Sequence, residues 1–131
     1  MEIQFDQSPY QRFLGVELVR AEEGLVEIRL PFKEDFLRED GSDWYHGGIV
    51  SALADIAGAY AVVTAAGGGE GSGATIDLRI DWLKPARKGD LLALGRVVKA
   101  GRRICVADVE VRDAASVLVA VARGTFTGPG S

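Results

Sequence analysis

Residues 46–63, HGGIVSALADIAGAYAVV, combine two features that could do chemistry. His46, Gly47 and Gly48 open the stretch, and a single carboxylate, Asp55, lies among apolar and small residues. Burial of an unpaired carboxylate costs on the order of several kcal/mol, unless the group is hydrogen-bonded, ion-paired or protonated. Asp55 is therefore a candidate catalytic group. Structural pairing with a neighbouring strand or subunit is the alternative, and the carboxylate alone does not separate the two.

The glycines suit a different task, because the pattern places them at the start of a helix. The segment from 48 to about 66 is too long for one strand, and its alanines favour a helix. Free N–H groups and the positive dipole end at a helix N-terminus suit an oxyanion. Glycine at 47 and 48 lets a ligand carbonyl approach these groups, which could stabilise the charge that develops under attack.

Asp55 and the glycines lie too far apart along this helix to act on one carbonyl. About two turns separate them, and Asp55 shares a stripe with Ser51 and Gly58. A site built from both groups needs the glycines of one chain and Asp55 of a second copy packed antiparallel to it. The sequence therefore predicts a homodimer with shared active sites.

A helix that is apolar on most of its circumference must be covered. Two alternating runs around a turn at 22–24 precede it, and a short helix is expected to begin at Ser8 and Pro9. A glycine-rich connector, 67–73, leads to four further strand-like runs, whose short connections favour antiparallel pairing. The pattern predicts an α+β fold in which a curved sheet surrounds the helix. Residues expected to face the core are Tyr60, Ile76, Leu78, Ile80 and Trp82.

Five short stretches together resemble one family. They are HGG at 46–48, LAD at 53–55, TIDLRIDWLKPARKGD, GRRICVADVEVRD and ARGTF. From about Phe13 to Phe126 the chain resembles the hotdog-fold acyl-CoA thioesterases, and most closely the PaaI-like branch linked to phenylacetic acid degradation. The resemblance implies one hotdog domain over 1–131, with a curved antiparallel sheet wrapped around one long central helix. It also implies hydrolysis of acyl-CoA, with coenzyme A as part of the substrate and no other cofactor, and dimers that pair into tetramers.

The resemblance also implies roles for single residues. Asp55 becomes the general base or nucleophile, Gly47 the preferred oxyanion donor ahead of Gly48, and His46 a residue that shapes the loop near the carbonyl. Thr75 matches a position whose hydroxyl hydrogen-bonds near the carboxylate. Asp40 is a departure, since this family often has Asn or Gln six residues before the histidine to hold water or the carbonyl. A second negative charge there would raise the pKa of Asp55.

Further residues are candidates for binding the substrate. Trp44 and Tyr45 adjoin the glycine loop and could line an acyl pocket, and Ser51 lies on the stripe of Asp55. Family members bind the phosphates of coenzyme A with cations at turns between strands. The cations at such positions in this chain are Lys84, Arg87, Lys88, Arg102 and Arg103, and each could equally be a solvated turn charge.

Composition narrows the classes of function. A net charge of −4 argues against sequence-independent binding to nucleic acid. The N-terminus lacks the pattern of a signal peptide, and Asp55 interrupts the longest apolar segment, so we expect a cytoplasmic protein that does not span a membrane. Cys105 is the only cysteine, which fits a reducing compartment, and its apolar surroundings predict burial. No metal site is expected.

Two other functions remain open at this level. Dehydration or hydration of an acyl thioester would need a histidine in a different, proline-containing loop, which YHGGIV does not supply. A non-catalytic acyl-CoA binding protein would not need a buried carboxylate. The sequence leaves the acyl group open between aryl-acetyl, benzoyl and medium-chain fatty acyl.

Overall fold

The computed structural model describes residues 3–67 and 71–131, and the middle of the expected connector at 67–73 lies outside them. The elements follow the order that the sequence predicts, with one added turn of 3-10 helix, η1. They are α1 (Pro9–Leu14), β1 (Glu17–Glu22), β2 (Leu25–Leu30), η1 (Glu34–Phe36), α2 (Gly47–Ala65), β3 (Thr75–Trp82), β4 (Leu91–Ala100), β5 (Ile104–Arg112) and β6 (Leu118–Thr127).

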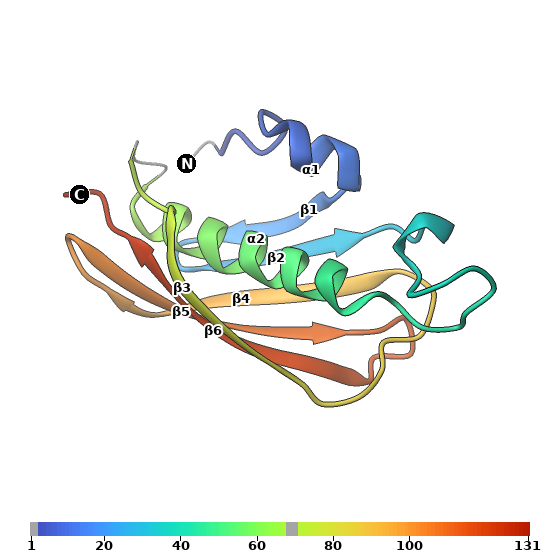
Figure 1. Ribbon diagram of the computed structural model, residues 1–131. Coiled ribbons are helices and arrows are strands. Elements are labelled where there is room, and N and C mark those ends of the chain that lie inside the picture. The colour runs from blue at the N-terminus through green and yellow to red at the C-terminus, as the bar shows by residue number, and fades with distance from the viewer. Residues whose placement is uncertain (1–2, 68–70) are drawn as a thin grey trace.

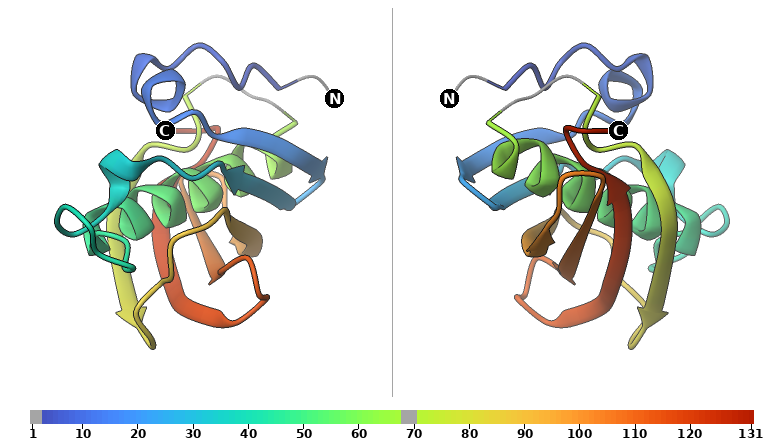
Figure 2. Two further views of the ribbon diagram at one scale, coloured as in Figure 1. Left: turned by 90° about the vertical axis from the view of Figure 1, so that its right-hand side faces the viewer. Right: turned by 90° about the vertical axis from the view of Figure 1, so that its left-hand side faces the viewer.

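The strands form one antiparallel sheet in the order β1-β2-β4-β5-β6-β3. The sheet curls around α2, with β1 and β2 on one side of the helix and β3 on the other (Figures 1 and 2). This arrangement confirms the predicted α+β fold with a curved sheet and one long central helix. Ahead of the sheet, Ser8 caps α1 by accepting a hydrogen bond from the Gln11 N–H, and Pro9 follows as the first helical residue, as expected.

Small residues let α2 and the sheet approach closely. Ala54, Ala57 and Ala61 on α2 are fully buried. A Cβ on Gly95 of β4 would collide with the carbonyl oxygen of Ala57, and one on Gly58 would lie 2.7 Å from the ring of Phe126. By length and composition α2 could cross a membrane, but half of its apolar stretch is buried inside the protein. The side chains of α2 are thus small and apolar because the helix fills a narrow core.

Strand β3 is less buried than its alternation predicts. Ile76 and Trp82 are 54% and 55% exposed, so the prediction that they face the core is wrong, whereas Leu78 and Ile80 are half-buried. The physical reason is position, because β3 is an edge strand and pairs only with β6. Alternation shows which side chains share a face but not whether the end of an edge strand is covered. The other two core predictions hold, since Tyr60 packs against the core and Cys105 is buried.

Candidate active site

His46 shapes the start of α2. It is the N-cap residue, in extended conformation, and its Nδ1 accepts a hydrogen bond of 2.9 Å from the Gly48 N–H. An imidazole nitrogen that accepts a hydrogen bond carries no proton, so the proton of the neutral ring lies on Nε2. The cap also occupies the Gly48 N–H, and this leaves Gly47 as the glycine that can donate to a ligand.

The Gly47 N–H has no acceptor among the described residues. As a first-turn N–H it has no partner within the helix, and it lies at the positive end of the α2 dipole. Gly47 borders an open pocket of about 350 Å³ together with Tyr45, Trp82 and Lys84. Trp82 lies beside it because the indole Nε1–H donates to the Gly47 carbonyl oxygen at 3.3 Å. This arrangement could bind a carbonyl oxygen at the Gly47 N–H.

Asp55 lies in a second and larger open pocket of about 930 Å³, whose wall also includes Gln11, Tyr60 and Thr75. The carboxylate is half-buried, and its Oδ1 accepts a hydrogen bond of 2.6 Å from the Thr75 hydroxyl on β3. Its Oδ2 has no hydrogen-bond partner in the described part of the chain. A structural hydrogen bond to the neighbouring strand β3 therefore explains only Oδ1 of Asp55. Oδ2 is free to act on water or on a carbonyl carbon.

One chain does not bring these two groups to one carbonyl. Gly47 and Asp55 are eight residues apart on α2, about 12 Å along its axis at 1.5 Å per residue. They also border different pockets. A site that uses both groups would need two copies of the chain, and the shared site stays a prediction.

Three other candidates make no hydrogen bond to Asp55. Asp40 is exposed in a loop and borders neither pocket. Trp44 is half-buried beneath the Arg87 guanidinium, 5.1 Å from its ring centre, and it borders neither pocket. Ser51 uses its hydroxyl to donate to the Gly48 carbonyl oxygen at 2.9 Å. Within the described part of the chain, the carboxylate therefore has no hydrogen bond from any of the three.

The candidate phosphate-binding cations form two groups at opposite ends of the sheet. Trp82 pairs with Ala120 at one end of β3, and Lys84, Arg87 and Lys88 follow at this end. Lys88 pairs there with Asp43 at 3.5 Å. At the other end Thr75 pairs with Phe126 and Ile104 with Thr127, so Arg102 and Arg103 lie near the Asp55 end of the site.

Tyr45 borders the Gly47 pocket, but its hydroxyl is already used. The side chain is 3% exposed, and its O–H donates to the Gly89 carbonyl oxygen at 2.6 Å. Burial, with a smaller effect from Asp90, raises the pKa of Tyr45 well above its usual value, so the hydroxyl stays protonated as a donor. Tyr45 therefore positions the loop before α2 and presents its ring to the pocket.

We expect Tyr45→Phe to lower the free energy of unfolding by about 1 kcal/mol, the usual net contribution of one such hydrogen bond. Urea denaturation measures the change. Tyr10→Phe is the matched control, because Tyr10 is 52% exposed. Equal stability of the Tyr45 variant and the wild type would show that the bond to Gly89 contributes nothing.

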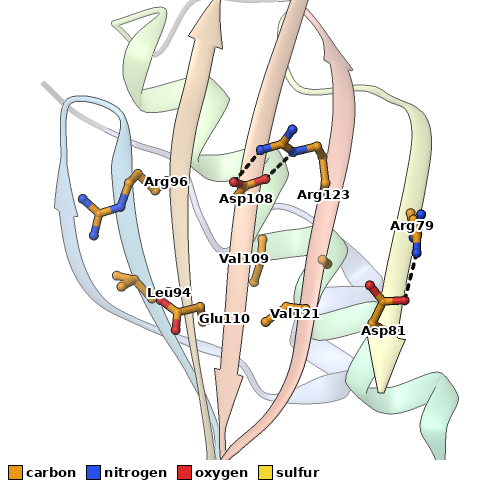
Figure 3. Close-up of a pocket in the computed structure, with 10 residues that line it drawn as sticks. Arg79, Asp81, Leu94, Arg96, Asp108, Val109, Glu110, Val121 and Arg123 are labelled. Atoms are coloured by element: carbon orange, nitrogen blue, oxygen red, sulfur yellow. Dashed lines mark hydrogen bonds and ion pairs between the residues drawn. The ribbon is translucent and has the colours of Figure 1, made fainter. Parts of the chain in front are cut away.

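A third hollow, of about 540 Å³, lies on the face of the sheet away from α2 (Figure 3). Four of its charged side chains form two ion pairs, Arg123 with Asp108 at 2.6 Å and Arg79 with Asp81 at 3.4 Å, and Glu110 pairs with Arg112 outside the hollow. The hydrogen bond from Arg123 lowers the pKa of Asp108. None of the candidate site residues borders this hollow. Within 3–67 and 71–131, no group of three or more His, Cys, Asp or Glu side chains could hold a metal ion.

Three residues that border these pockets were not among the candidate site residues. Gln11 and Tyr60 border the pocket of Asp55, although they come from α1 and α2 and are 49 residues apart. Trp82 borders the pocket of Gly47 rather than the core. Gln11 and Trp82 reach these pockets only through the tertiary arrangement, whereas Tyr60 follows Asp55 by five residues on α2.

Known proteins are similar to this chain in fold and in sequence. Residues 45–120 match the model of the thioesterase superfamily. The PaaI protein from the phenylacetic acid degradation operon of Escherichia coli superposes with a TM-score of 0.82 at 26% identity, over 94% of this chain and 86% of that one. A candidate esterase of Saccharolobus solfataricus is 36% identical over 87% of this chain and 73% of its own length. A medium/long-chain acyl-CoA thioesterase of Escherichia coli is 26% identical over 90% and 84%.

The chain therefore belongs to the thioesterase superfamily. It is a hotdog-fold thioesterase of the PaaI-like type, and its reaction is the hydrolysis of a thioester. This confirms the family, fold and class of enzyme that the sequence motifs predict.

Proposed function

We propose that the protein hydrolyses acyl-CoA thioesters to the free acid and coenzyme A, at two equivalent sites shared by a homodimer. The observation that carries the proposal is the pair of free groups on α2. Gly47 has an unengaged N–H at one end of the site, and Asp55 has an unengaged carboxylate oxygen in a large open pocket. The similar acyl-CoA thioesterase of Escherichia coli supports coenzyme A as the thiol.

Each group has a distinct step in the proposed reaction. The Gly47 N–H binds the thioester carbonyl oxygen and stabilises the negative charge that develops on it. Asp55 of the second copy acts on the carbonyl carbon in one of two ways. It either takes a proton from the attacking water, or it attacks the carbon itself, forming an anhydride that water then cleaves. In both routes the C–S bond breaks and coenzyme A leaves as the thiolate, which takes a proton from Asp55 in the first route and from solvent water in the second, and no cofactor takes part.

The exposed edge of β3 supports this dimer. Gly47 lies beside Trp82 at one end of the strand, and Asp55 is bonded to Thr75 at the other. Antiparallel pairing of two β3 edges about a two-fold axis would bring the Trp82 end of one chain to the Thr75 end of its partner. Gly47 of one copy would thereby approach Asp55 of the other. The same pairing would cover Ile76 and satisfy the free backbone groups of the edge.

The pairing also joins the two groups of cations. Lys84, Arg87 and Lys88 of one copy would meet Arg102 and Arg103 of the other at each site. A concentration of positive charge there suits the phosphates of coenzyme A. We further propose that two such dimers associate into a tetramer and that the enzyme acts in the cytoplasm, where Cys105 stays reduced.

Release of free thiol from a panel of acyl-CoAs tests the proposal. Benzoyl-, phenylacetyl- and octanoyl-CoA cover the three acyl classes that the sequence leaves open. We expect thiol release from at least one of them. Saturable binding without thiol release would instead indicate an acyl-CoA binding protein, and hydration of an unsaturated acyl-CoA would indicate a hydratase.

Thr75→Val is expected to lower kcat about tenfold, because Asp55 loses the hydroxyl that fixes its Oδ1 and small misplacement of a catalytic group is costly. Steady-state thiol release measures the effect. Thr125→Val on β6 is the matched control, since Thr125 makes no hydrogen bond to Asp55 and pairs with Asp77 and Val106 instead. Wild-type kcat in a folded Thr75 variant would show that Thr75 does not position Asp55 for catalysis.

A further inference from the structure

Trp82 holds the proposed oxyanion donor from a different element. Its indole is 55% exposed at the end of β3, and Nε1–H donates to the Gly47 carbonyl oxygen at 3.3 Å. A Cβ on Gly47 would lie 3.5 Å from Nε1 and 3.8 Å from Cε2, so the indole lies on the side of Gly47 where a side chain would begin. Within 3–67 and 71–131, no other side chain makes a hydrogen bond to Gly47.

The two peptide groups that flank the α-carbon of Gly47 are held by different partners. The group before it is planar, so the Gly47 N–H points opposite to the His46 carbonyl oxygen, which accepts from the Ile49 N–H at 3.0 Å. The group after it carries the carbonyl oxygen that accepts from Trp82. Glycine has no Cβ to restrict its backbone. The bond from Trp82 therefore adds a restraint on the direction of the Gly47 N–H that the residue itself does not supply.

Strand β3 contacts both proposed catalytic groups, one at each end. Thr75 donates to Asp55 Oδ1 at 2.6 Å where the strand begins, and Trp82 donates to Gly47 where it ends. Pairing with β6 fixes both ends of the strand. The two contacts therefore tie the base and the oxyanion donor to the same sheet.

We propose that Trp82 is a positioning residue for thioester hydrolysis, and that its indole N–H holds Gly47 so that the Gly47 N–H meets the developing oxyanion. The inference rests on the proposed function, because it takes the Gly47 N–H as the oxyanion donor. The hydrogen bond performs this role, rather than the bulk of the ring. Because the negative charge on the carbonyl oxygen develops only on the way to the transition state, a misplaced donor lowers kcat and leaves KM largely unchanged.

Two substitutions separate the hydrogen bond from the ring. Trp82→Phe keeps an aromatic ring but has no N–H. Trp82→His loses the larger ring but keeps an N–H, because imidazole Nε2 has the same place relative to Cγ as indole Nε1. In Trp82→Phe we expect kcat to fall about tenfold, with KM unchanged within about twofold. In Trp82→His we expect kcat to stay within about threefold of the wild type.

The acyl panel and a control variant complete the kinetic test. The carbonyl is common to benzoyl-, phenylacetyl- and octanoyl-CoA. Trp82→Phe should therefore lower kcat by the same factor, within about threefold, for each of them that the wild type hydrolyses. Tyr10→Phe also removes an aromatic donor, but at a position that is 52% exposed and borders no pocket of the site, so it should keep wild-type kcat and KM.

The infrared spectrum of a bound thioester reports the same hydrogen bond without turnover. A donor to the carbonyl oxygen weakens the C=O bond and lowers its stretching frequency. In an Asp55→Asn background, octanoyl-CoA with an isotope label at the carbonyl carbon should absorb at lower frequency when bound than when free. Adding Trp82→Phe should return the frequency towards the free value, whereas adding Trp82→His should not.

The outcomes separate this inference from the proposed function. Wild-type kcat in a folded Trp82→Phe protein overturns the inference alone, and so does a loss in Trp82→His as large as in Trp82→Phe. Losses that differ between acyl groups by more than about threefold overturn it too, because the ring would then contact the acyl group. If the wild type hydrolyses none of the three thioesters, the proposed function fails, and the infrared comparison decides the inference. A lowered frequency that only Trp82→Phe restores supports it, and a frequency that Trp82→Phe leaves unchanged, or no binding, overturns it.

Discussion

Asp55→Asn is expected to lower kcat for thioester hydrolysis at least about a hundredfold, the usual scale for a positioned general base. The amide keeps an oxygen that can accept from Thr75, but it neither takes a proton from water nor attacks a carbonyl carbon. The fold should survive, because the carboxylate has one hydrogen bond and no ion pair among the described residues. Thiol release by the purified variant measures the loss.

Asp77→Asn is the matched control for this experiment. Asp77 is at the same end of β3 as Thr75, and its backbone pairs with that of Thr125. Its side chain is exposed. Its variant should hydrolyse thioesters at the wild-type rate. An Asp55→Asn protein that is folded and equally active would show that Asp55 has only a structural role.

Gly47→Val should lower kcat/KM about a hundredfold or more, the scale observed when one oxyanion donor is lost. A Cβ at Gly47 would lie 3.5 Å from Trp82 Nε1, an ordinary contact, so the chain has room for the side chain. The valine methyl groups would nevertheless crowd the N–H and block a ligand carbonyl. Gly47→Ala should lower kcat/KM less than Gly47→Val, because alanine adds only one methyl group. Wild-type activity in a folded Gly47→Val protein would exclude this N–H as the donor.

Gly48→Val would reduce activity by a different route. Its Cβ would lie 3.0 Å from His46 Nδ1, so the valine displaces the imidazole that caps α2. The cap itself occupies the Gly48 N–H, which is why the geometry favours Gly47 as the oxyanion donor.

The sequence predicts the framework of this fold well, because the framework follows from local periodicity. The α2 helix, the β1–β2 hairpin and four later strands could all be read from the spacing of apolar residues. The contact between Thr75 and Asp55 was predicted from family resemblance, and the structure has that hydrogen bond. Whether either residue takes part in catalysis stays a prediction.

The remainder depends on tertiary structure. The exposure of Trp82 could not be read from its strand, because it depends on β3 being at the edge of the sheet. The hydrogen bond between Gln11 and Tyr60 joins elements that are far apart in the chain, so no sequence window contains it. The cations at 84–88 and those at 102–103 belong to opposite ends of the sheet, although all of them lie at turns between strands.

Mixing two inactive variants tests the shared site most directly. Gly47→Val and Asp55→Ala are each purified, unfolded together, refolded as a one-to-one mixture and assayed for thiol release. A mixed dimer combines the intact Gly47 of one chain with the intact Asp55 of the other at one of its two sites. With random pairing, half of the dimers are mixed, so the mixture should regain about a quarter of wild-type activity.

Each variant refolded alone, and the double variant mixed with itself, serve as controls and should stay inactive. Recovery of about a quarter of the wild-type rate is the result that a site shared between Gly47 and Asp55 predicts. A mixture that forms mixed dimers but stays as inactive as either variant alone would contradict it, because both groups would then have to come from one chain.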